Sequence, residues 1–336
     1  MGFETQDVAR KVTTILKVLD DTMDPLGARV IAHHLQDFGI ELGERAVRYH
    51  LKLMDEQGLT RLVGRRDGRV ITEKGREEIA SALVKDKVGF AISKIDLLAF
   101  RTTFDPGQQS GLIPVNVSFF PQGDFRRALR AMKPAFDAGL AVSDLVRVAD
   151  EGQSLGDLVV PQGKMGLATV CSIVFNGVLL RASVPVSSRF AGILQMRNRK
   201  PLRFVELIHY AGCSLDPSSI FIRARMTTVT EVIKTGNGNL LANFREIPAP
   251  CRPLVDDIMA ALNRAGLRLV MAMGDPSEPV CEVSMEMNKI GMVLMVGLNP
   301  VALAEETGIA ANNHTMSTVM EYQDLMEFRE VLRERD

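Results

Sequence analysis

The segment from Glu44 to Gln57 separates its apolar residues from its basic residues at the spacing of two opposite helix faces. Val47, Leu51 and Met54 recur at helical spacing and predict a buried stripe. The opposite stripe carries long hydrogen-bond donors and one aromatic ring, and its members are Arg45, Arg48, Tyr49 and Lys52. Such a helix can dock on a small domain through one face and enter the DNA major groove through the other. An ordinary solvated surface helix has the same pattern, so the neighbouring segments decide between the two interpretations.

The neighbouring segments complete a winged helix-turn-helix within residues 1–85. Helical periodicity occurs twice before Glu44, and a compact turn with a glycine at each end joins the second helix to the third. After Gly58 the periodicity changes to that of two short strands around a basic, glycine-bracketed turn. The predicted elements are helices over 7–19, 28–37, 44–57 and 73–83, with wing strands over 59–63 and 69–72. A recognition helix followed by a β-wing is the order of a winged helix.

Positive charge is concentrated on the third helix and the wing. Residues 44–76 hold nine Lys or Arg against five Asp or Glu, whereas the first 85 residues hold 14 of each. The whole chain has a formal net charge of −1, so only this local patch can attract a phosphate backbone. We predict that Arg45 and Arg48 contact bases, with Tyr49 and Lys52 beside them. The wing residues predicted to hold phosphates are Arg65, Arg66 and Arg69. A winged helix that binds protein instead of DNA remains the alternative.

Cysteine usage and hydropathy narrow the class of protein. The four cysteines, at positions 171, 213, 251 and 281, include no C-x-x-C pair, which argues against a zinc ribbon or a redox motif. Few cysteines in 336 residues suit a reducing cytoplasm. The first residues lack the charged-then-apolar pattern of a signal peptide, and the most apolar run, 291–298, is too short to span a bilayer. We therefore expect a cytoplasmic protein with no membrane partner.

Residues 105–336 are predicted to form a separate α/β (α+β) domain, which a connecting helix over 86–104 joins to the winged helix. Alternating apolar residues predict a strand over 112–120, and the Asn176-Gly177 pair inside 170–180 predicts a hairpin turn. The other predicted elements are a helix over 125–138 and strands over 140–148, 204–210 and 220–229.

Two stretches of this domain have similar layouts. Ala138-Gly-Leu140 and Ala265-Gly-Leu267 each end a predicted helix, and Lys164-Met-Gly-Leu167 and Lys289-Ile-Gly-Met292 follow 26 and 24 residues after the alanine. In this alignment the strand over 220–229 opens the second copy, as the strand over 112–120 opens the first. A duplication predicts two related lobes, and a cleft between lobes is a common place for a small ligand. Chance similarity between two short motifs is the alternative.

Several segments in both parts of the chain carry a resemblance to a known family. They are Glu44–Leu51, Val88–Ile95, Thr169–Ser172, Asn176–Leu180, Gly212–Pro217, Asn243–Pro248 and Gly297–Ala302. On these segments the chain resembles the NrpR family, the nitrogen-responsive repressors best known in methanogenic archaea. Those proteins join an N-terminal winged helix to one or two copies of a regulatory domain, and the present chain contains only one.

The resemblance implies a transcriptional repressor whose regulatory domain senses 2-oxoglutarate, the carbon skeleton for ammonia assimilation. A high concentration of this effector would release the protein from DNA. Because a single regulatory domain gains two-fold character only by dimerisation, we expect a homodimer on double-stranded DNA. Its operator should be an inverted repeat with half-sites about one helical turn, roughly 10 bp, or a multiple of it apart.

A dicarboxylate effector needs cationic or N–H donors in a sheltered cleft. Arg245 is the first candidate for a bidentate carboxylate contact, and a structural ion pair with Glu246 or another acid is its alternative. Gly236 and Gly238 belong to a loop that could present backbone N–H groups to an anion, or could form a plain hairpin turn. Cys171 is a further pocket candidate, with a small buried hydrophobe as its alternative.

The chain shows no pattern of a catalytic or metal site. His209 and His314, the histidines outside the winged helix, belong to no H-E-x-x-H, G-x-S-x-G or P-loop motif. We predict a regulator that is not an enzyme and that needs no cofactor. Two other classes stay open: a small-molecule enzyme fused to an autoregulatory winged helix, and an RNA-associated module like the winged helix of ribonuclease R.

Overall fold

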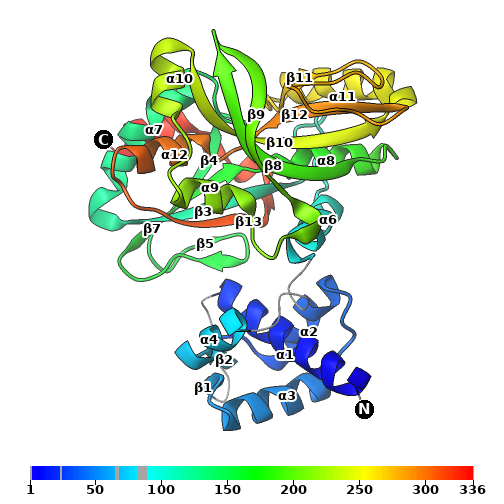
Figure 1. Cartoon of the computed structure of the whole chain (residues 1–336). Coiled ribbons are helices and arrows are strands. Elements are labelled where there is room, and N and C mark those ends of the chain that lie inside the picture. The colour runs from blue at the N-terminus through cyan, green and yellow to red at the C-terminus, as the bar shows by residue number, and fades with distance from the viewer. Residues whose placement is uncertain (1, 23–24, 65–67, 82–88, 336) are drawn as a thin grey trace. The chain divides into compact units, whose positions relative to one another are not determined.

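A computed structural model describes residues 2–22, 25–64, 68–81 and 89–335 of the chain. The chain divides into two compact units, Met1–Val88 and Gly89–Asp336, and each has its own hydrophobic core. The first unit is blue in Figure 1, and the second runs from cyan to red. No helix within the described ranges is long and apolar enough to cross a membrane.

The first unit is a winged helix with the predicted order of elements. Its first helix begins at Gly2, several residues before the start that periodicity predicts. Strands β1 and β2 pair antiparallel with Thr60 opposite Ile71, and Leu26 adds a bridge to Arg69 on the outer side of β2. The elements are α1 (Gly2–Thr22), α2 (Ala28–Asp37), α3 (Glu44–Glu56), β1 (Thr60–Gly64), β2 (Gly68–Ile71) and α4 (Glu73–Ser81).

The apolar stripe of α3 is buried as predicted. Val47, Leu51 and Met54 are at most 1% exposed and pack in one core with residues of α1 and α2. Gly58 ends the helix with φ of 74°, which L side chains rarely adopt, and the Leu59 N–H donates to the Met54 carbonyl at 2.8 Å. Burial of this stripe therefore leaves the opposite, basic face of α3 to solvent.

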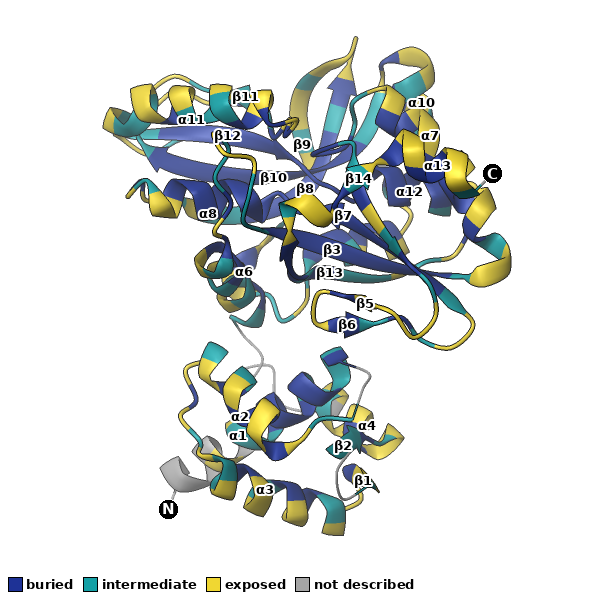
Figure 2. Ribbon diagram, turned by 180° about the vertical axis from the view of Figure 1, so that it is seen from behind, coloured by how far each residue is buried: buried dark blue, intermediate teal, exposed yellow. Residues whose placement is uncertain are grey.

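The second unit is built on two five-stranded antiparallel sheets. Their strand orders are β13-β3-β7-β4-β14 and β11-β12-β10-β8-β9. The central strands β3 and β10 are buried along almost their whole length, as Figure 2 shows in dark blue. The strands are β3 (Leu112–Pro121), β4 (Leu145–Ala149), β5 (Ser154–Leu155), β6 (Leu158–Val159), β7 (Lys164–Val170), β8 (Ser187–Arg197), β9 (Lys200–His209), β10 (Gly238–Pro248), β11 (Val270–Met273), β12 (Lys289–Met295), β13 (Asn312–Glu321) and β14 (Met326–Glu327).

Helices cover these sheets. Short 3-10 turns η1 and η3 introduce α7 and α11 in the same way, each directly after a long central strand. The helices are α6 (Phe90–Arg101), η1 (Gln122–Asp124), α7 (Phe125–Asp137), α8 (Ile173–Arg181), η2 (Tyr210–Gly212), α9 (Pro217–Arg223), α10 (Val229–Thr235), η3 (Ala249–Cys251), α11 (Arg252–Arg264), α12 (Asn299–Glu306), η4 (Tyr322–Asp324) and α13 (Phe328–Arg335).

The second unit is a duplication with exchanged strands. Apart from the short hairpin β5–β6, which only the first copy contains, the order strand, 3-10 turn, helix, two strands, helix, strand runs from β3 to β8 and again from β10 to β13. The last strand of each copy leaves its own sheet: β8 pairs with β10 of the second copy, and β13 pairs with β3 of the first. The predicted pair of related lobes is therefore confirmed, and each lobe needs a strand from the other to complete its sheet.

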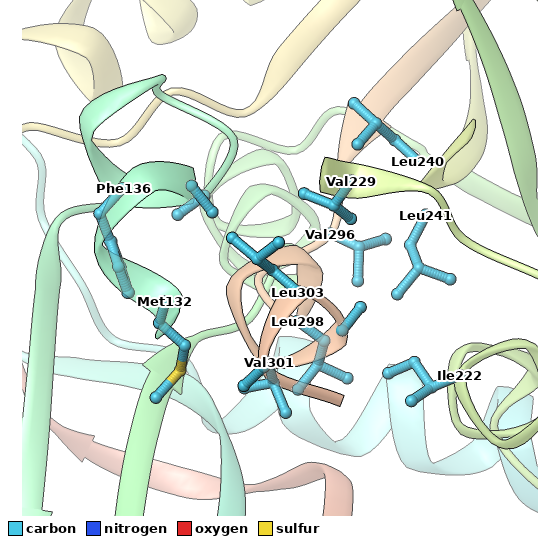
Figure 3. Close-up of a cluster of buried hydrophobic side chains, with 14 of the residues drawn as sticks. Met132, Phe136, Ile222, Val229, Leu240, Leu241, Val296, Leu298, Val301 and Leu303 are labelled. Carbon is cyan, nitrogen blue, oxygen red and sulfur yellow. The ribbon is translucent and has the colours of Figure 1, made fainter. Parts of the chain in front are cut away.

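One core runs through both copies. Helix α7 of the first copy packs on α12 of the second, and their side chains share a cluster of buried apolar residues (Figure 3). Met132 and Phe136 come from α7, whereas Val301 and Leu303 come from α12. Because this cluster draws on both copies, neither lobe has a complete core without the other.

The hairpin predicted at Asn176-Gly177 is wrong. Both residues lie inside α8, and both are buried. An Asn-Gly pair favours a tight turn only where the local backbone is free to choose. Here Gly177 is required by tertiary packing, because a Cβ at this position would lie 2.3 Å from the Cβ of Thr102.

The strand predicted over 220–229 is also wrong. This segment holds the end of α9, a turn with Arg225 at φ of 53°, and the start of α10. The start of α9 is set by Asp216, whose side chain accepts the Ser218 N–H at 3.1 Å, with Pro217 in the first turn. These capping residues outweigh the β-branched composition. The strand that opens the second copy is β10 instead.

Helix α6 belongs to the second unit. Ala91, Ile95 and Leu98 are buried, and the helix packs on α8, β3 and β13. The segment 86–104, predicted as a connecting helix, thus contributes a helix that packs within the second unit. Residues 86–88 of that segment lie outside the described ranges.

Candidate functional site

The exposed face of α3 presents the predicted basic residues. Arg45, Arg48, Tyr49 and Lys52 are all exposed, and the Tyr49 side chain is 63% accessible. Arg48 forms an ion pair with Glu44 one helical turn earlier, and Lys52 lies 3.9 Å from a carboxylate oxygen of Glu56. Exposed pairs of this kind contribute only about 0–1 kcal/mol, so both cations can exchange a carboxylate for a phosphate or a base edge.

The wing presents fewer of the predicted contacts. Arg65 and Arg66 lie outside the described residues. Arg69 donates from Nε to Asp55 at 2.7 Å, and its side chain is 20% exposed. Thr60 binds the other carboxylate oxygen of Asp55 at 2.6 Å. The structure therefore places Arg69 in the internal joint between α3 and the wing, whereas Arg61, which was not predicted, is exposed on β1.

A small polar cavity lies where the two halves of the second unit meet. Its volume is about 10 Å³, room for roughly one water molecule. Its walls come from β3, β10 and β13, from the segments that follow β7 and β12, and from η2 and α9. The lining residues are Asn116, Cys171, Ser172, Ile173, Tyr210, Asp216, Ser218, Asn243, Arg245, Val296, Gly297, Leu298 and Met316.

Arg245 is the charged group of this cavity that is buried most completely. It is 1% exposed, and its Nε donates to Oδ1 of Asn176 at 3.2 Å. Nη1 donates to the Phe244 carbonyl at 3.2 Å, and the guanidinium lies 5.2 Å from the ring centre of Tyr210. Within the described part of the chain, no carboxylate lies at ion-pair distance from it. The alternative ion pair with Glu246 is wrong, because that carboxylate binds Arg189 at 3.3 Å.

A hydrogen-bonded chain of polar side chains continues from Tyr210. The Tyr210 hydroxyl donates to Oδ1 of Asn243 at 2.8 Å, and Nδ2 of Asn243 donates to Oγ of Ser172 at 2.8 Å. Burial raises the pKa of Tyr210 well above its usual value, so the hydroxyl stays a donor. Burial also raises the pKa of the Cys171 thiol to about 12, which keeps it protonated and unreactive.

Asp216 is the carboxyl group of the cavity wall. Burial raises its pKa above the usual value of 3.8, and a hydrogen bond from the Ser218 backbone opposes this shift. Lys94 on α6 also lowers this pKa by its charge. The cavity thus combines one fixed positive charge with one acid whose charge depends on its surroundings.

The duplication gives each half of the cavity an asparagine. Asn116 of β3 and Asn243 of β10 both stand five residues before a proline that ends the strand. The equivalents differ in role: Oδ1 of Asn116 accepts the Met316 N–H at 2.9 Å, whereas Asn243 binds Ser172 and Tyr210. The shared Asn-x-x-x-x-Pro spacing is therefore a sequence signal that Asn116 and Asn243 are equivalent. The sequence alignment missed it because it opened the second copy with residues 220–229 instead of β10.

Gly236 and Gly238 do not line the cavity. Gly236 follows α10 in the left-handed region with φ of 78°, and its carbonyl accepts the Arg199 N–H at 2.8 Å. Gly238 starts β10, seven residues from Arg245, which is roughly 23 Å along an extended strand. Of the predicted effector residues, the structure therefore brings together Arg245 and Cys171 only.

A winged helix joined to a separate domain is an organisation found in transcription regulators. The family model of NrpR regulatory domains 1 and 2 matches residues 88–327, and that of the ribonuclease R winged-helix domain matches residues 13–79. The chain belongs to the NrpR family, and it is a regulator, not an enzyme.

Named relatives agree with this assignment. The chain is 39% identical to the global nitrogen regulator NrpRI of Methanosarcina mazei over 95% of its own length and 98% of the relative's. It is 33% identical to NrpR of Methanococcus maripaludis and 32% identical to NrpR of Methanocaldococcus jannaschii, and it spans only 52% and 55% of those longer chains. A solved nitrogen repressor-like protein from Methanococcus jannaschii covers 72% of the chain with a TM-score of 0.61 and 26% identity, and 99% of that protein is matched.

Proposed function

We propose that this chain is a homodimeric DNA-binding repressor that 2-oxoglutarate releases from an inverted-repeat operator. The effector assignment rests on the burial of Arg245 without an ion pair to any described residue. Its guanidinium is 1% exposed, and among the described residues no carboxylate lies at ion-pair distance to replace the hydration that it loses. A ligand carboxylate supplies that charge, together with two parallel hydrogen bonds.

The size of the cavity makes effector binding a conformational event. A space of about 10 Å³ has room for one water molecule, so a dicarboxylate enters only when a wall moves. An effector that must open its own site binds the open arrangement in preference to the closed one. That difference in affinity is what can shift a DNA-binding equilibrium.

The DNA-binding half of the proposal rests on α3. Its exposed basic face has the position of a recognition helix, and Gly43 leaves the helix N-terminus without a side-chain cap. Arg45 and Arg48 would contact base edges, whereas Arg65 and Arg66 of the wing would contact phosphates. Two such helices in a dimer would read two half-sites related by a two-fold axis.

Calorimetry with 2-oxoglutarate tests the effector assignment. The full chain should bind it, and Arg245→Gln should not, whereas Arg189→Gln should bind as the wild type does because that arginine lies outside the cavity. No heat and no thermal stabilisation at millimolar ligand would exclude 2-oxoglutarate. Competition between duplex DNA and structured RNA separates the operator-binding proposal from an RNA-binding role, which the match to the ribonuclease R winged helix also supports.

A further inference from the structure

Helix α6 forms an outer wall of the cavity that holds Arg245. Its buried residues Ala91, Ile95 and Leu98 share one apolar cluster with residues that line the cavity, namely Cys171, Ile173, Tyr210 and Met316. The Ala91 N–H also donates to the Cys213 carbonyl at 3.4 Å. Along the chain, α6 is the first helix after the winged-helix unit. A displacement of α6 therefore moves the helix with which the second unit begins.

Two adjacent residues of α8 join the cavity to α6. Asn176 accepts from Nε of Arg245 at 3.2 Å, and its Nδ2 donates to Oγ of Ser188 at 3.0 Å. A Cβ on the next residue, Gly177, would lie 2.3 Å from Cβ and 2.6 Å from Cγ2 of Thr102, which caps the C-terminus of α6. Glycine weakens a helix interior, so the close contact with α6 accounts for its presence here.

We infer that Asn176 and Gly177 couple effector binding to the movement of α6, an inference that rests on the proposed effector role of Arg245. A carboxylate that binds Arg245 through Nε takes the N–H from which Asn176 now accepts, so Asn176 is a positioning residue of the site. Its reorientation shifts α8. Since the Gly177–Thr102 contact leaves no free space between the two helices, α6 moves with α8, because packed helices slide as units.

Gly177→Ala tests this coupling at a position that does not line the cavity. The added methyl group collides with Thr102 and so displaces α6 from its ligand-free position without any ligand. In ligand-free protein, affinity for a duplex selected by the wild-type chain from random sequences should fall at least about 5-fold. Saturating 2-oxoglutarate should then change this affinity by less than about 2-fold, against about 5- to 150-fold in the wild type. The ligand itself should still bind the variant, because Gly177 does not line the cavity.

Two matched variants control for helix and folding effects. A Cβ at Gly123 meets nothing within 4 Å, so Gly123→Ala should behave as the wild type does in both assays. Combining Gly177→Ala with Thr102→Gly removes the collision and should restore DNA affinity and the response to 2-oxoglutarate. Thermal unfolding of each variant shows that the comparison is made between folded proteins.

The outcomes separate this inference from the proposed function. Wild-type DNA affinity and response in Gly177→Ala would overturn the coupling, and so would a double variant that fails to recover. If the wild-type chain binds no 2-oxoglutarate, the effector assignment is wrong. The ligand-free measurement still decides the coupling in that case, because it compares the DNA affinities of Gly177→Ala, Gly123→Ala and the double variant without any ligand.

Discussion

Tyr210→Phe isolates the hydrogen bond that holds the polar chain of the cavity together. The substitution removes only the hydroxyl, which donates to Oδ1 of Asn243 at 2.8 Å, and keeps the ring that faces Arg245. Tyr210 is 2% exposed, so the abandoned acceptor regains a partner only if a water molecule occupies the small cavity beside it. Leaving a buried polar atom without its partner costs about 1–3 kcal/mol of unfolding free energy. We therefore expect the second unit to lose about that much stability.

Calorimetric unfolding of the full chain measures this loss. For a unit of the size of Gly89–Asp336, each 1 kcal/mol lowers Tm by about 2–4 °C, so the expected shift is about 2–12 °C. Only one of the two unfolding transitions should move, because the winged helix has a separate core. Tyr49→Phe is the matched control, since that side chain is 63% exposed and its loss of a hydroxyl should shift neither transition.

An unchanged Tm for Tyr210→Phe would refute the reasoning. It would mean that water replaces the lost donor and that the cavity is wet in the ligand-free protein. An equal shift in Tyr49→Phe would show that the measured loss has no connection with burial. Either result would show that the lost hydrogen bond does not set the stability of the second unit.

Three further predictions concern DNA, pH and assembly. Arg48→Ala should cost about 1–3 kcal/mol of operator-binding free energy and relax the preference for the operator sequence. Arg66→Ala should lower the affinity for all duplexes alike and reduce the slope of log affinity against log salt concentration by about one. Filter binding at several salt concentrations compares the two variants. Burial raises the pKa of Asp216 in the folded state. The stability that this carboxyl group contributes is therefore fully present below about pH 3.8 and is lost as pH rises through the raised pKa. The Tm of Asp216→Asn should lack this decline with pH. A chain truncated after Lys85 should be monomeric by sedimentation and bind one half-site weakly, and full-length protein that stays monomeric on DNA would contradict the proposed dimer.

The winged helix could be predicted because its determinants are local. The apolar and basic stripes of α3 alternate within one helix, and Gly58 marks its end through its own backbone conformation. Each of these signals depends on neighbours within about four residues. The role of Arg69 could not be predicted in the same way, because its partner Asp55 lies 14 residues away, across the joint between α3 and the wing.

The errors in the second unit arise where tertiary contacts override local preference. Asn176-Gly177 has the composition of a hairpin turn, yet α6 and Arg245 hold it in a helix. Of the residues that line the cavity, only Arg245 and Cys171 were predicted from the sequence. The other polar residues come from five separate segments of the chain, so no local pattern brings them together. No local pattern reports that Ser172, Tyr210 and Asn243 share one chain of hydrogen bonds.

The exchange of strands explains why the site lies where it does. Each sheet is completed by a strand of the other copy: β13 pairs with β3, and β8 pairs with β10. The two copies therefore cannot move apart without breaking these two strand pairs. Residues that face each other across this junction are therefore held by both copies. Part of the junction is closed by backbone, since a Cβ at Gly297 of the second copy would lie 2.0 Å from the carbonyl oxygen of Val170 in the first copy. Another part is filled by Arg245 and Asn243 of β10 and by Tyr210, which lies between the two copies in the chain.

This asymmetry is what a duplicated fold needs in order to bind a small, unsymmetrical ligand. Two equal halves would present two arginines and two identical surfaces to one molecule. Here only β10 supplies a cation, and β3 carries Ser118 at the matching position. A ligand bound as proposed, with one carboxylate on Arg245, would meet different groups at its other end, namely Asn116, Met316 and the backbone around Gly297. The duplication supplies the rigid junction, and the difference between its two halves would fix the orientation of the proposed ligand.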